Sequence, residues 1–146
     1  MQHFKKIVFI LLTAFCFMNT QCDEDDDYYF GNCDDVVIVD EGLYNSLSSE
    51  NFTFIDTEII DDCLSITIGA SGCDGNSWSF SLVASEAIAE SFPEQRYLKF
   101  QLDNKEECLA VFERTVTFDL TPIQIEGSQE IILNIEELES SLNYKY

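Results

Sequence analysis

From residue 36 onward, short runs of apolar and alternating apolar and polar residues are separated by turn residues. Alternation with a period of two is typical of β-strands that have one buried face. The segments that we predict as strands are 36–39, 51–60, 63–68, 78–82, 97–102, 108–120 and 131–135. Short strands with turn signals at this spacing are typical of a sandwich. The sequence therefore predicts an all-β fold, a seven-stranded antiparallel immunoglobulin-like β-sandwich, with a small barrel as the alternative.

Several segments depart from strict alternation. Residues 36–39 are apolar throughout, and the alternation slips near Ile55, where a β-bulge would explain the shift. Residues 41–50 and 136–141 are connections that each have room for a single helical turn, and 85–94 is ambiguous between strand and helix. We expect helix to be confined to short stretches of this kind.

Ahead of the predicted domain lies a short apolar run behind two lysines. Lys5 and Lys6 are followed by residues 7–18, which are apolar except for Thr13. A membrane-spanning helix needs roughly 20 apolar residues, and this run is clearly shorter. The pattern is therefore typical of an export signal rather than of a membrane anchor.

The end of this signal predicts how the protein is processed. Cys22 follows the apolar run at the distance at which a lipoprotein signal ends in its lipidated cysteine. A simple secretory signal instead needs small residues before its cleavage site, which residues 19–21 do not provide. We predict that residues 1–21 are a lipoprotein signal peptide and that Cys22 is lipidated, with a freely secreted form as the alternative. Two or three acyl chains would anchor the protein firmly to a membrane.

An acidic segment follows Cys22 directly. Its first residues are Asp23, Glu24, Asp25, Asp26 and Asp27, and three aromatic residues, Tyr28, Tyr29 and Phe30, interrupt the later ones. Like charges repel and extend a chain, so we predict residues 22–34 to be a tether between the lipid and a domain at 35–146. The aromatic residues would cover an edge of the domain's sheet or contact a partner.

The net charge limits the partners of the exported chain. Removal of residues 1–21 takes away two of the 7 basic residues and none of the 28 acidic ones, which leaves a formal charge of −23. Such a charge disfavours nucleic acid, whose phosphates attract Lys and Arg, and it repels anionic lipid surfaces. The apolar content of 46% is too high for a disordered chain, so one domain with a real core is expected.

Four cysteines remain for the domain, and an even number in an exported protein predicts disulfides. If every connection between strands reverses direction, Cys33 before the first strand and Cys63 at the start of the third lie at one end. Cys73 after the third strand and Cys108 at the start of the sixth then lie at the opposite end. We therefore predict the pairs Cys33–Cys63 and Cys73–Cys108. Zinc is the rival interpretation, but the sequence contains no CxxC pair and no histidine near these cysteines.

Catalytic motifs are absent from the sequence. The one histidine, His3, lies in the predicted signal, so the exported chain has no histidine for acid–base catalysis or metal binding. The sequence contains no G-x-S-x-G elbow, no P-loop and no G-x-G-x-x-G. Carboxylates are the remaining catalytic groups, and a glycosidase needs two of them across a cleft.

Calcium is the other chemistry that the acidic residues suggest, because Ca²⁺ prefers oxygen ligands. The weak candidates are Asp34, Asp35, Asp61 and Asp62, which the predicted Cys33–Cys63 disulfide would bring together. The sequence contains no D-x-D-x-D-G loop, so an unliganded surface is the simpler interpretation. We therefore assign no metal and no other cofactor.

The N-terminal pattern resembles the lipoproteins of Bacteroidota-type bacteria, in which acidic residues behind the lipidated cysteine form a surface-export signal. Here Cys22 and residues 23–27 match that pattern. The domain also resembles small uncharacterised surface lipoproteins of the same bacteria, through 64–68, 72–73, 78–82, Cys108 and 117–122. The resemblance implies an outer-membrane protein that faces the extracellular side, and it brings no established activity. Relatives of this type often have a histidine near Trp78, which this chain lacks.

The leading functional interpretation is a non-enzymatic, lipid-anchored binding or accessory module of unknown molecular function, with an unknown protein or glycan as its partner. The enzyme alternative is a carboxylate-dependent hydrolase of a polysaccharide, which requires a cleft with two converging carboxylates. A secreted inhibitor or immunity factor is the third possibility, and it would present a rigid loop at the Cys73 turn.

Overall fold

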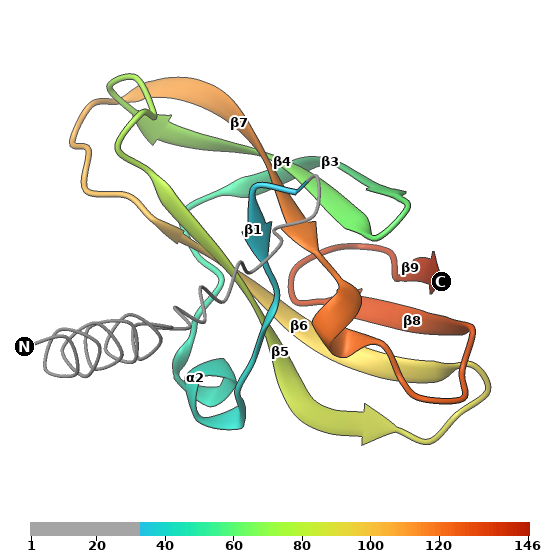
Figure 1. The fold of residues 1–146 in the computed structure, drawn as a ribbon. Coiled ribbons are helices and arrows are strands. Elements are labelled where there is room, and N and C mark those ends of the chain that lie inside the picture. Colours follow the sequence, from blue (N-terminus) through green and yellow to red (C-terminus); the bar gives the residue numbers. More distant parts are fainter. Residues whose placement is uncertain (1–32) are drawn as a thin grey trace, which may run out of the picture.

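A computed structural model of the protein describes residues 33–146 (Figure 1). Within these residues, nine strands form two sheets. The strands are β1 (Asp35–Val36), β2 (Ile38–Val39), β3 (Thr53–Ile60), β4 (Cys63–Gly72), β5 (Ser79–Ala89), β6 (Glu94–Asp103), β7 (Ala110–Asp119), β8 (Glu130–Ile135) and β9 (Leu142–Lys145). The helical elements are α2 (Glu41–Ser46) and the 3-10 turn η1 (Thr121–Ile123).

The two sheets are both mixed. The four-stranded sheet has the order β1-β7-β4-β3 and the five-stranded sheet the order β2-β5-β6-β8-β9. The pairs β1/β7, β2/β5 and β6/β8 are parallel, and the other pairs are antiparallel. The predicted all-β class is confirmed, whereas the seven-stranded antiparallel immunoglobulin-like arrangement is wrong in strand number and in strand direction.

Two of the parallel pairs come from the apolar run that we expected to be a single strand. Residues 35–36 pair with β7 in one sheet, and residues 38–39 pair with β5 in the other. Val37, between them, is buried, and its N–H donates to the carbonyl of Asp119 at 3.1 Å. The run passes from one sheet to the other and so closes this side of the sandwich (Figure 1). Of its residues Val37 is buried, whereas Ile38 and Val39 are exposed.

The local irregularities agree partly with the sequence. The bulge predicted near Ile55 is confirmed by a register shift between Phe54 and Asp56. The helical turn expected after residue 40 is α2, whose first turn is capped by Asp40 accepting from the Leu43 N–H at 2.6 Å. The turn expected at 136–141 is not helical. The first half of the ambiguous segment 85–94, residues 85–89, continues β5, and Glu94 begins β6.

The core lies between the two sheets. Strand β4 alternates strictly, with Leu64, Ile66 and Ile68 fully buried. Phe100 on β6 is also fully buried and lies within 6.0 Å, between ring centroids, of four other phenylalanines, which are Phe52, Phe54, Phe80 and Phe118. Trp78 is buried in the same core, so it packs rather than offering a surface for stacking.

The structure contains the disulfides Cys33–Cys63 and Cys73–Cys108, the same pairs that the sequence predicts. For the second pair the reasoning is also correct, because β4 and β7 are antiparallel, with Gly72 opposite Ala110. For the first pair it is not, because β1 runs parallel to β7 and therefore opposite to β4. Cys33 still reaches the start of β4 because β1 has only two residues.

In the part of the chain that the structure describes, no helix has the length and apolar character required to span a bilayer.

Phe100→Ala tests the position of the core. The substitution removes a fully buried ring from an aromatic cluster, so we expect the free energy of unfolding to fall by about 3–5 kcal/mol. Urea unfolding followed by circular dichroism measures it. Phe92→Ala is the matched control, because the Phe92 side chain is 99% exposed. Equal losses in both variants would contradict this description of the core.

Candidate functional site

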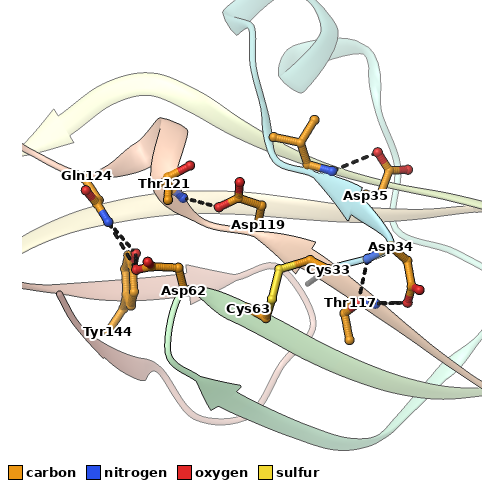
Figure 2. Close-up of a disulfide and its surroundings, with 11 residues drawn as sticks. Cys33, Asp34, Asp35, Asp62, Cys63, Thr117, Asp119, Thr121, Gln124 and Tyr144 are labelled. Carbon is orange, nitrogen blue, oxygen red and sulfur yellow. Dashed lines mark hydrogen bonds between the residues drawn. A yellow bond between two sulfur atoms is a disulfide. The ribbon is translucent and has the colours of Figure 1, made fainter. Parts of the chain in front are cut away.

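Three of the four calcium candidates, Asp34, Asp35 and Asp62, lie around the Cys33–Cys63 disulfide, where their carboxylates accept hydrogen bonds within the fold (Figure 2). The Asp34 carboxylate accepts from the Thr117 N–H at 3.0 Å and from the Thr117 hydroxyl at 2.8 Å. The Asp35 carboxylate accepts from the N–H of Val36 at 2.8 Å. These bonds hold residues 34–36 against the end of β7.

Asp62 joins the two sheets at the same end of the domain. Its carboxylate accepts from the Tyr144 hydroxyl at 2.5 Å and from the Gln124 side-chain amide at 3.2 Å (Figure 2). Burial, followed by the bond to Asp62, raises the pKa of Tyr144. The Asp62 carbonyl also accepts from the Leu120 N–H at 2.8 Å. Asp62 therefore ties the β3–β4 turn to β9 and to the end of β7.

The structure gives the calcium hypothesis no support. Among residues 33–146, no three His, Cys, Asp or Glu side chains gather as a metal ion would require. Asp61 is exposed in the β3–β4 turn with φ of 54°, and the carboxylates of Asp34, Asp35 and Asp62 accept hydrogen bonds from the protein. Their clustering is explained by the structural bonds that each of these three makes.

The opposite end of the four-stranded sheet carries the Cys73 turn, which we define as residues 73–77. The Glu106 carboxylate enters this turn and accepts from the N–H groups of Cys73, Gly75 and Asp74 at 2.5, 3.1 and 3.2 Å. It also accepts from the Ser77 hydroxyl at 2.7 Å. Successive backbone N–H groups of this kind form an anion-binding nest, here filled by the chain's own carboxylate.

Arg114 holds the Cys73 turn from its other side. Its guanidinium donates to the carbonyls of Asp74 and Gly75 and, at 3.1 Å, to the side chain of Asn76. Gly75 has φ of 68°, a left-handed conformation that disfavours larger residues. With the Cys73–Cys108 disulfide, these contacts make the turn rigid.

Two glutamates have clearly shifted pKa values, and both shifts are downward. The Ser77 hydroxyl and the three backbone N–H groups hold the pKa of Glu106 at about 2. The Ser85 hydroxyl, which donates at 2.6 Å, is the main cause that lowers the pKa of Glu41. Both carboxylates are therefore fixed in the charged form, where they accept hydrogen bonds.

Exposed apolar side chains lie next to the Cys73 turn. Leu109, the residue just before β7, is 90% exposed, and Val111 on β7 is 72% exposed. Val111 pairs with Ser71 on β4, and Ile55 on β3 lies over Gly69, 3.1 Å from where a Cβ would be. We call the outer-face residues Leu109, Val111 and Ile55 the apolar patch. Gly69 and Ser71, on the outer face of β4 between Ile55 and Val111, have small side chains that project little from the sheet.

A hollow with a volume of about 620 Å³ lies at the β5–β6 and η1–β8 loops. It is lined by Phe92, Pro93, Glu94, Gly127, Ser128, Gln129, Glu130, Lys145 and Tyr146. The Ser128 hydroxyl donates to Glu94 at 3.0 Å, and Lys145 lies 3.6 Å from Glu130. We call this hollow the Phe92 cleft, because the fully exposed Phe92 ring forms one wall.

The structure describes some of the site residues predicted from the sequence but not others. Cys22, the export signal 23–27 and Tyr28, Tyr29 and Phe30 lie outside the described residues. Cys33 and Asp34, which we assigned to the tether, already contact the domain. Reasoning from the sequence considered Glu106 only as one of several loop carboxylates, and it missed its role in the Cys73 turn, Arg114 and the apolar patch. The available signal for the patch was Leu109, an apolar residue beside Cys108 in an acidic segment.

No protein-family model matches the sequence, and no curated protein is significantly similar to it. Two solved structures from Bacteroidales are similar in fold. One is a protein of unknown function, DUF1344, from Bacteroides vulgatus (TM-score 0.49, 16% identity), and the other a putative toxin related protein from Parabacteroides distasonis (TM-score 0.46, 15% identity). The alignments cover 77% and 76% of this chain, but only 54% and 59% of those chains. A similarity of this size gives neither protein's function to the present chain.

Glu106→Gln tests the nest in the Cys73 turn. The folded-state pKa of about 2 lies below the ordinary value of 4.5, so the charged carboxylate stabilises the fold above pH 4.5. This contribution disappears as the pH falls from 4.5 towards 2. We therefore expect Glu106→Gln to lower the melting temperature at pH 7, and the difference from wild type to shrink by pH 2. Glu107→Gln, at an exposed neighbouring position, is the control; a difference independent of pH would contradict the assignment.

Proposed function

We propose that the protein is a non-enzymatic binding module that a lipid on Cys22 holds at the outer membrane, facing outward, and that its partner is another protein. The observation that carries the proposal is the apolar patch beside the rigid Cys73 turn. Leu109 and Val111 expose most of their side-chain surface, in a domain whose other leucines and valines are largely packed in or against the core. Exposed apolar groups that gather on one face indicate an interaction site.

The rigidity of the neighbouring turn supports protein binding at this surface. Association orders side chains and loops, and that cost is smaller where the surface is already fixed. The disulfide, the Glu106 carboxylate and the Arg114 guanidinium fix the Cys73 turn before any partner arrives. A secreted inhibitor or immunity factor would use the same rigid turn, so it is a special case in which the bound protein loses its activity.

The lowered pKa values of two carboxylates support a non-enzymatic role. A hydrolase of the two-carboxylate type needs one acid that stays protonated near neutral pH. Glu41 and Glu106 have lowered pKa values, which is the opposite direction.

A glycan is the second candidate partner, and the Phe92 cleft is the observation that favours it. An aromatic ring exposed beside hydroxyl, amide and carboxylate groups can stack on a sugar and accept hydrogen bonds from its hydroxyls. Nucleic acid is disfavoured as a partner by the charge of the exported chain.

Paired substitutions separate these candidates. With a protein partner at the apolar patch, Leu109→Ser/Val111→Ser reduces binding of the captured partner at least about tenfold, because the removed side chains form the centre of the interface. Phe92→Ser leaves this binding unchanged. Cross-linking on intact cells, followed by affinity measurement with the captured protein, provides the readout. Loss of binding in Phe92→Ser alone would assign the function to the cleft, and a glycan array would identify its ligand.

The anchor has its own test. Cys22→Ala removes the sulfur that would carry the lipid, so we expect the protein to move from the outer-membrane fraction to the soluble fraction. Fractionation and mass spectrometry of the mature N-terminus measure this change. Cys16→Ala, inside the apolar run, should leave the distribution unchanged. A membrane-bound Cys22→Ala protein would contradict lipidation at this position.

A further inference from the structure

The sheet edges on the two sides of the sandwich differ in whether a short strand covers them. On one side, residues 35–39 add short strands to both sheets, so β7 and β5 are covered. On the opposite side the edge strands are β3 and β9, and β3 is the longer, with eight residues. In the part of the chain that the structure describes, β4 is the only strand that pairs with β3. The outer edge of β3 therefore presents unpaired N–H and C=O groups.

A groove runs along this free edge. Its volume is about 380 Å³, and its walls are residues 52–57 on one side and residues 137–140 of the β8–β9 turn on the other. We call it the β3 groove. Glu137 has φ of 66°, which is uncommon for a glutamate. The β8–β9 turn, which forms the second wall, therefore has a specific backbone conformation.

Part of the lining of the β3 groove, which we call its floor, is apolar. Phe52, Phe54 and Leu138 line it and are partly buried against the core. The Phe52 ring packs edge to face on Phe54 and on Phe100, with centroids 5.1 Å apart in both pairs. A strand added beside β3 would direct every second side chain onto this floor.

The rim of the groove is acidic. Asp56 lines the groove, and Glu137 and Glu139 lie on the opposite wall; Glu58 follows just beyond the lining, on the same outer face of β3 as Asp56, and all four are exposed. None of the three ion pairs among residues 33–146 involves these four carboxylates, and no lysine or arginine lines the groove. Their charges are therefore left for an external cation.

The same acids disfavour a second copy of the chain as the occupant. In an antiparallel pairing about a two-fold axis, the residue on the axis lies opposite itself. An axis at Thr57 would place Asp56 opposite Glu58, and an axis at Asp56 or Glu58 would place that acid opposite itself. Like charges directly opposite each other destabilise a strand pair. The segment around Tyr28–Phe30 is itself acidic, so it is also a poor electrostatic match.

We propose that the β3 groove binds an extended basic segment of another protein by strand addition. Backbone hydrogen bonds to the free edge of β3 supply affinity, and the alternation of the added strand supplies specificity. Its inward residues are apolar and pack on Phe54 and Leu138, and its outward residues are Lys or Arg beside Asp56 and Glu58. The β3 groove shares Ile55 with the apolar patch, but Leu109 and Val111, the centre of that patch, do not line the groove.

A designed peptide tests the proposal on the mature full-length protein. The probe is a blocked, fluorescently labelled peptide as long as β3 in which valine and lysine alternate. Two comparison peptides replace lysine by glutamate or carry N-methyl groups at alternate amides, which removes one edge's hydrogen bonds. Fluorescence anisotropy measures affinity, and hydrogen exchange locates the bound site. We expect the lysine peptide to bind, both comparison peptides to fail, and exchange to slow in residues 53–60.

Charge variants provide the matched control. Asp56→Lys/Glu58→Lys should weaken binding of the lysine peptide at least about tenfold, since attraction becomes repulsion. Glu86→Lys/Glu90→Lys makes the same change in net charge at exposed positions on and after β5, and should leave the affinity unchanged. Unchanged melting temperatures establish that both variants fold. Equal weakening in both would show a general charge effect and overturn the proposal.

Other outcomes also decide the question. Binding of the N-methylated peptide, or slowed exchange outside 53–60, would exclude strand addition at β3. A concentration-dependent dimer that Asp56→Lys/Glu58→Lys alters would assign the groove to a second copy and overturn the proposal. Leu109→Ser/Val111→Ser should bind the peptide normally. If the wild-type protein does not bind the peptide, this inference is rejected. If Leu109→Ser/Val111→Ser then still loses the cellular partner, the proposed function at the apolar patch stands independently.

Discussion

Strand β4 is covalently held at both of its ends, by Cys63 at its first residue and by Cys73 just past its last. The two disulfides enclose sequence separations of 30 and 35 residues, for which about 2–4 kcal/mol each is typical. Between these points, every second side chain of β4 enters the core, and β3 and β7 pair with its two edges. Both proposed binding surfaces use strands that are positioned in this way, so their geometry depends on β4.

The distribution of charge follows from how few cations the domain has. All five of its basic residues lie at 96, 99, 105, 114 and 145, and three of them are engaged inside the fold. Arg96 is buried. Arg114 holds the Cys73 turn, and Lys99 donates to the Leu47 carbonyl and lies 4.8 Å from the centre of the Tyr44 ring. Most acidic residues are therefore left without a cation. A surface of this kind stays soluble and attracts basic partners, which links the acidic rim of the β3 groove to the composition of the whole chain.

The proposed surfaces use different physical interactions, which suits a module displayed outside the cell. The apolar patch offers area to be buried on a rigid support, whereas the β3 groove offers unpaired backbone groups beside negative charge.

Neither surface was predicted from the sequence. In the sequence, Asp34, Asp35, Asp61 and Asp62 were only weak candidates for calcium ligands. Acidic residues near a disulfide look the same whether they bind a cation or, as Asp34, Asp35 and Asp62 do, accept hydrogen bonds from Thr117, Val36 and Tyr144. Only the positions of those donors distinguish the two cases.

Local patterns were sufficient for the all-β class, the bulge at Ile55 and helix α2, since each reflects the alternation or spacing of nearby residues. The disulfide pairs also match, although the strand directions assumed for Cys33–Cys63 are wrong. Local patterns could not show which of the two sheets a strand joins. An apolar run such as 36–39 has the same composition in one strand as in a passage between two sheets, and strand direction depends on where the chain returns. The Glu106 nest joins residues about 30 positions apart, and the β3 groove exists because no other strand among residues 33–146 pairs with that edge. Contacts between distant residues, and their absence at an edge, arise only when the chain has packed.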